Sequence, residues 1–139
     1  MKSVNGSTHR SNAYYERIVA GVKQLLASKG FVAPIDLFVI LDLVDSVKVQ
    51  KWRSGKIECF EKIVTCNLSK ASQVMRVLKF HALEIGLKPS SSVYLVKATR
   101  KPLKFSKSGN PSIEAAYATH FVGMSHKSKE TGGGNESAL

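Results

Sequence analysis

Apolar residues between positions 67 and 89 recur at alternating spacings of three and four, which is the spacing of one helix face. The stripe consists of Leu68, Ala71, Met75, Leu78, Ala82 and Ile85. Asn67 can cap the first turn, Gly86 suits a left-handed helix end, and Pro89 stops any continuation. The pattern therefore predicts one long helix that buries this stripe.

Two apolar segments precede this helix. The first begins near Asn12 and has helical spacing up to a stop at Lys29-Gly30. The second, residues 34–44, is almost wholly apolar, so its period fits a buried helix or a buried strand. Pro34 at a first helical position and Asp36 in the first turn favour the helix. Both segments are predicted to belong to the core.

Shorter helices are predicted on either side of residue 55. Asp45 or Ser46 can cap a helix over residues 47–53, and residues 58–66 form the next one. Trp52 lies among lysines and arginines, so it could stack on a base between phosphate contacts. Alternatively it anchors its helix to the core, the usual role of a tryptophan with apolar neighbours.

The residues after the long helix predict a β-hairpin and a last helix. Residues 93–105 alternate as strands do, with a turn at residues 99–102. Asn110 and Pro111 then suit the start of a helix whose core-facing residues would be Ile113, Ala116, Tyr117 and Phe121. The loop at residues 106–111 could hold an anion at this helix N-terminus, or serve as an ordinary cap.

These elements predict one domain of the α+β class, mainly α, at residues 12–122. Residues 1–11 and 123–139 are polar without periodicity, so we expect a loose start and a disordered tail. A hydrophobic content of 43% is enough for a single modest core. The first ten residues lack a signal peptide's apolar centre, and no run is long enough to span a membrane, which favours the cytoplasm.

The charge is strongly basic. The chain has 21 Lys and Arg against 10 Asp and Glu, a formal net charge of +11, which favours acidic partners such as nucleic acid or an acidic protein. No acidic residue lies between Glu84 and Glu114, where six cations occur. Cations at a hairpin tip suit phosphate contacts, but they also protect an edge strand from aggregation.

No catalytic set, metal site or cofactor motif is recognisable. Cys59 and Cys66, placed on one helix, would lie too far apart to form a disulfide, so both are expected to be buried free thiols. The histidines are His9, His81, His120 and His126, and none has the spacing of a metal pair. A small hydrolase or nuclease with a site assembled in space stays an alternative.

The residues Leu68, Ser69, Ser72, Val74, Arg76 and Leu78, followed by Gly86-Leu87 and a basic hairpin, resemble the recognition helix and wing of winged helix-turn-helix DNA-binding domains. That resemblance covers residues 67–105 and implies non-catalytic binding of double-stranded DNA. It implies base contacts from Ser69, Ser72, Gln73 and Arg76, and phosphate contacts from Lys70, Lys79, Arg100, Lys101 and Lys104.

Phrases across most of the chain, namely WRSGKI, GLKPSSSVY and FSKSGNPSIEAAYATHF, also resemble small bacterial proteins with no assigned function. The alternative to nucleic-acid binding is a protein-interaction module for an acidic partner. A homodimer is compatible with either function.

Overall fold

The computed structural model describes residues 9–123. Its helices are α1 (Tyr15–Lys29), α2 (Pro34–Ile40), α3 (Ser46–Arg53), α4 (Leu68–Glu84) and α5 (Pro111–Ala118). Its 3-10 turns are η1 (His9–Ser11) and η2 (Phe60–Ile63), and its strands are β1 (Phe31–Val32), β2 (Lys88–Ser91) and β3 (Thr119–Val122). The fold is α+β and mainly α, as predicted. The predicted disordered tail after Gly123 lies outside the described residues.

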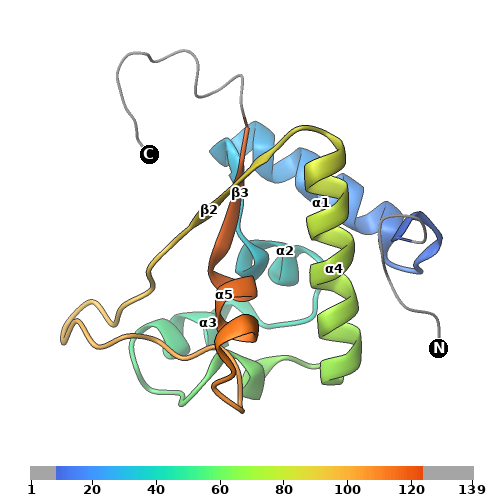
Figure 1. The fold of residues 1–139 in the computed structure, drawn as a ribbon. Helices are drawn as coiled ribbons and strands as arrows, with labels where there is room; N and C mark the ends of the chain where they lie inside the picture. The colour runs from blue at the N-terminus through green and yellow to red at the C-terminus, as the bar shows by residue number, and fades with distance from the viewer. Residues whose placement is uncertain (1–8, 124–139) are drawn as a thin grey trace, which may run out of the picture.

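The strands form one antiparallel sheet in the order β1-β3-β2, with β3 in the middle. Phe31 pairs with Val122, and Ser90 pairs with His120. Figure 1 shows α4 on one side of the strands and the loop after β2 on the other, with α1 crossing behind the ends of β2 and β3. The residue pattern does not predict this sheet, because its strands have only two to four residues each and all four residues of β2 are exposed.

The long helix forms as predicted, but its buried face differs from the predicted stripe. Asn67 caps α4 by accepting from the N–H of Lys70, and Gly86 has a φ of 84° after the helix end. Buried positions are Ala71, Val74, Val77, Leu78, His81 and Ala82. Leu68 and Ile85, at 42% and 47% exposure, do not belong to the core. Leu68 is the first residue of α4 and Ile85 is its C-cap, so both lie at the ends of the helix, outside its buried face.

The segment 34–44 is a helix only as far as Ile40, and Pro34 and Asp36 occupy the predicted first turn. The predicted helix over 58–66 is wrong, because only Phe60–Ile63 form a 3-10 turn. The N–H groups of Phe60 and Glu61 donate to the carbonyls of Lys104 and Phe105. Pairing with a distant segment replaces the local hydrogen bonds that a helix would need.

The segment between α3 and α4 differs from the one that a helix-turn-helix requires. A helix-turn-helix needs two helices joined by a short turn. In the described chain, α3 ends at Arg53 and α4 begins at Leu68, with η2 between them. The helix that should precede the recognition helix is therefore not formed.

The hairpin at 93–105 is much less regular than predicted. It contains one isolated β-bridge, between Leu95 and Pro102. Two further hydrogen bonds, from Leu103 N to Tyr94 O and from Val96 N to Lys101 O, hold its arms together. Pro102 has no N–H to donate, which shortens the ladder. We call residues 94–103 the basic loop.

The last helix is shorter than predicted. Asn110 caps α5 by accepting from the N–H groups of Ser112 and Ile113, and Pro111 starts the helix. The helix ends at Ala118, so Phe121 is buried on β3 and not on α5. Tyr117 is buried as predicted, whereas Ile113 and Ala116 are exposed, since only one face of this short helix meets the core.

The N-terminal boundary also differs from the prediction. His9, expected in a loose start, is only 3% exposed, and its Nε2 lies 3.2 Å from Glu84 Oε1. Arg10 bonds to the other oxygen of the same carboxylate. Residues 9–11 therefore pack against the end of α4 as part of the folded domain.

Candidate nucleic-acid interface

Trp52 fixes the position of α3. Its side chain is fully buried, and its Nε1 donates to the carbonyl oxygen of Lys104 at 2.9 Å. The indole packs against Phe60 and Phe105 at centroid distances of 5.3 and 5.2 Å. Trp52 therefore anchors α3 to the core, as the second interpretation predicted, and it is not available to stack on a base.

The end of α3 contacts the basic loop. A Cβ atom at Gly55, where φ is +85°, would lie 3.2 Å from Cγ2 of Val96. The guanidinium carbon of Arg53 lies 5.1 Å from the centre of the Tyr94 ring. Two basic segments that are about forty residues apart in the sequence thus meet at one surface.

We define the α3–loop surface by its exposed cations, which are Lys51, Arg53, Lys56, Lys97, Arg100 and Lys101. Among residues 9–123, none of these six side chains forms an ion pair with a carboxylate. Arg100 has a positive φ of 63° at the tip of the loop. Unpaired like charges concentrated on one surface repel each other and attract an anionic partner.

The predicted base-reading residues lie elsewhere. Figure 1 shows α4 across the molecule from the basic loop, with α5 and β3 between them. Ser69, Lys70, Ser72, Arg76 and Lys79 are exposed on α4, while Arg100 and Lys101 belong to the loop. The structure does not bring the α4 residues and the loop residues onto one surface.

Two predicted contact residues have partners inside the protein. The side-chain oxygen of Gln73 accepts from Asn12 Nδ2 at 3.1 Å, which joins α4 to the turn between η1 and α1. Lys104 is half-buried, and its carbonyl accepts from both Trp52 and the N–H of Phe60. Substituting either residue would therefore affect internal contacts as well as any ligand contact.

The loop before α5 does not offer an open anion site in the described structure. Glu114 accepts from the N–H groups of Phe105 and Ser106 and from the Ser106 hydroxyl. Glu61 accepts from the N–H of Lys107 at 2.8 Å and from the Tyr117 hydroxyl at 3.0 Å. The Asn110 side chain also accepts from the N–H groups of Ser112 and Ile113, so these N–H groups of the loop and first turn already have acceptors, which supports the interpretation as a cap.

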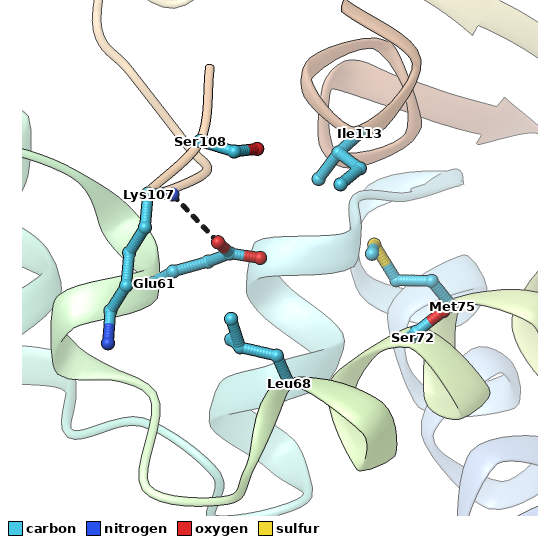
Figure 2. A pocket seen from close by; sticks show the side chains of 7 residues that line it. All are labelled: Glu61, Leu68, Ser72, Met75, Lys107, Ser108 and Ile113. Atoms are coloured by element: carbon cyan, nitrogen blue, oxygen red, sulfur yellow. Dashed lines mark hydrogen bonds between the residues drawn. The ribbon is translucent and has the colours of Figure 1, made fainter. Parts of the chain in front are cut away.

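A small pocket of about 180 Å³ lies between this loop and α4. Figure 2 shows the Glu61 carboxylate directed at the Lys107 backbone, while Leu68, Met75 and Ile113 form the apolar part of the wall. Leu68 and Ile113 were both predicted to be buried in the core, but the structure places them at the wall of this pocket. The pocket explains their exposure, since α4 and α5 do not close over this position.

One polar cluster was not found from the sequence. The ring of His120 lies between two hydroxyls: Ser92 Oγ is 3.0 Å from Nδ1, and Tyr94 Oη is 2.7 Å from Nε2. Phe31 stacks on the same ring at 5.1 Å and 8°. The sequence pattern placed His120 within the last helix, where no local pattern connects it to Ser92, whereas the structure places it on β3. Only the pairing of β2 with β3 brings them together.

The cysteines are both free, although they do not share a helix. Cys59 is buried before η2, as predicted, whereas Cys66 was predicted to be buried and is only half-buried. Burial raises the pKa of the Cys66 thiol, which disfavours its reactive thiolate form.

Comparisons with protein-family models, curated protein sequences and solved structures find no match to this chain. Within residues 9–123, no helix is both long and apolar enough to cross a bilayer.

Proposed function

We propose that this protein binds nucleic acid without catalysing a reaction, with duplex DNA as the expected form, and that the α3–loop surface contacts the phosphate backbone. The observation that supports this proposal is the junction of Gly55 with Val96, which joins two groups of unpaired cations. Phosphate contacts by lysine and arginine release counterions from nucleic acid and so make binding depend on salt. We propose the cytoplasm as its location.

The test is binding measured by fluorescence anisotropy at several salt concentrations, with duplex DNA, single-stranded DNA and RNA. Affinity for duplex DNA should fall steeply, with a log–log slope of about 0.9 for each phosphate contacted. A flat salt response, or no binding at low salt, would contradict the proposal and favour the interaction module with an acidic protein partner.

A charge-matched pair of triple variants locates the interface. Lys97→Ala/Arg100→Ala/Lys101→Ala removes three charges from the basic loop, and Lys70→Ala/Arg76→Ala/Lys79→Ala removes three from α4. The loop variant should bind more weakly and with a smaller salt slope, reduced by about 0.9 for each phosphate that it no longer neutralises. The α4 variant should change less. The reverse result would support α4 as the interface, as the winged-helix resemblance implies.

A change in base preference would distinguish groove reading from backbone contact. If Arg76 reads a base, Arg76→Ala should relax sequence preference at a cost of ~1–3 kcal/mol. If only the α3–loop surface binds, the variant should bind all sequences as the parent does.

A further inference from the structure

The cluster around His120 lies on the outer face of the sheet. In the β2–β3 ladder Ser90 is opposite His120, and Ser92 follows two residues later on the same face. The neighbouring residues Val32 and Phe121 point the other way and are buried. Thus Phe31, His120 and Ser92 share a face that the apolar core does not use.

The cluster has one more hydrogen-bond donor than its two hydrogen bonds use. A neutral imidazole provides one N–H, and each hydroxyl provides one O–H, which makes three donors for two hydrogen bonds. If Nε2 carries the proton, Tyr94 keeps a free O–H; if Nδ1 carries it, Ser92 does. Within residues 9–123, neither hydroxyl has a second acceptor.

The protonation states at neutral pH support this count. Burial lowers the pKa of His120, and Lys29 and Arg53 add to this effect while Asp36 opposes it. Burial also raises the pKa of Tyr94 to about 12, so its hydroxyl stays protonated. The imidazole is therefore mainly neutral and the phenol is intact.

The charges around the cluster favour an anion as the missing acceptor. Arg53, part of the α3–loop surface, lies over the Tyr94 ring. Lys29 lies 5.9 Å from the centre of the Phe31 ring. Asp36 is the acidic residue that acts on both His120 and Tyr94, and its carboxylate is bound to Lys29 at 2.8 Å.

We propose that Ser92, Tyr94, His120 and Arg53 bind a phosphomonoester, the terminal phosphate of a nucleic-acid strand held on the α3–loop surface. A phosphomonoester offers three terminal oxygens and up to two charges, so it can accept from the spare hydroxyl and from the guanidinium together. A phosphodiester within a strand offers fewer oxygens and one charge. The assignment of the phosphate to a nucleic-acid strand rests on the proposed function, whereas the phosphate site itself does not depend on it.

The site itself is tested by NMR of the His120 ring, assigned by its loss in His120→Gln. A nucleoside 5′-monophosphate should shift the ring signals in a saturable way, whereas the nucleoside should not. Equal shifts from both compounds, or no shift at millimolar concentration, would overturn the site. Free inorganic phosphate should compete with the monophosphate.

Three consecutive serines give matched controls. Ser92→Ala and Tyr94→Phe should each weaken monophosphate binding about tenfold, the usual range for a hydrogen bond to a charged group. Ser90→Ala and Ser91→Ala, which remove hydroxyls from the adjacent strand, should bind as the parent does. If all three serine variants behave alike while remaining folded by circular dichroism, Ser92 has no special role and the assignment is wrong.

Oligonucleotides of one sequence with a 5′-phosphate, a 3′-phosphate or neither separate the two proposals. An end phosphate should raise affinity about tenfold in the parent and not in Tyr94→Phe. Equal affinity for all three strands would overturn the end-binding role and leave the proposed function intact. If no strand binds but the monophosphate shifts His120, the proposed function fails and the ligand is a free nucleotide.

Discussion

Two regions of this domain are stabilised in different ways. In the helix-pair region, α1 packs against α4, and η1 covers the end of α4. In the aromatic region, the rings of Trp52, Phe60, Tyr94, Phe105 and Tyr117 hold together α3, η2, the basic loop and α5. Phe105 and Tyr117 stack at 5.4 Å with an angle of 3°.

The difference lies in how the backbone hydrogen bonds are satisfied. Helices satisfy their own N–H and C=O groups, so in the helix-pair region the side chains need only pack. The aromatic region consists largely of loops, whose buried backbone groups need partners from elsewhere. Glu61 and Glu114 supply those partners, which is why carboxylates are found close to a core of aromatic rings.

The largest effect is expected at Trp52. Trp52→Ala removes a fully buried indole and should cost about 3–5 kcal/mol in the free energy of unfolding, measured by chemical denaturation. Val47→Ala, at a 61% exposed position on the same helix, should cost less than about 0.5 kcal/mol. Equal losses would mean that the aromatic rings do not carry the stability of this region.

Leu78 is the corresponding test in the helix-pair region. Leu78→Ala, at 1% exposure, should cost ~2–5 kcal/mol through the cavity that it leaves. Leu68→Ala, on the same helix at 42% exposure, is the matched control and should cost much less. If Leu68→Ala were as destabilising, the buried face of α4 would be the predicted stripe after all.

A third prediction concerns the carboxylates of the aromatic region. Glu114→Gln weakens several bonds to the backbone of Phe105 and Ser106 and should cost about 1–3 kcal/mol. Burial raises the pKa of Glu114, but hydrogen bonds from Ser106 and these N–H groups outweigh it, so the pKa is lowered. This stabilisation is present above the unfolded value near 4.5 and is lost as the pH falls through the folded pKa.

The smallest effect is expected at the end of α4. Hydrogen bonds from Arg10 and then His9 lower the pKa of Glu84 to about 2. Because the folded value is below the ordinary value of 4.5, this stabilisation should be lost between pH 4.5 and about 2. Arg10→Ala should raise the Glu84 pKa measured by NMR and leave that of Glu58 unchanged. An unchanged Glu84 pKa would show that residues 9–11 do not hold this carboxylate in solution.

The sequence by itself determined the elements whose signals are local. Asp45, Asn67 and Asn110 cap the helices that they were predicted to cap. Pro34 starts α2, and Gly30 and Gly86 take left-handed conformations after α1 and α4. Each of these features depends on bonds between residues a few positions apart, so the pattern of neighbouring residues is sufficient to predict it.

The tertiary structure alone decided the features whose partners are distant in the sequence. Residues 58–66 had a helical pattern, yet the first two N–H groups of η2 donate to the carbonyls of Lys104 and Phe105 and not to local carbonyls. The same dependence applies to the candidate sites. Local sequence patterns identified Arg53 and the basic loop separately, but only the tertiary contact between Gly55 and Val96 brings them together. His120 meets Ser92 only because β2 pairs with β3, and a pairing between distant strands leaves no mark on the local residue pattern.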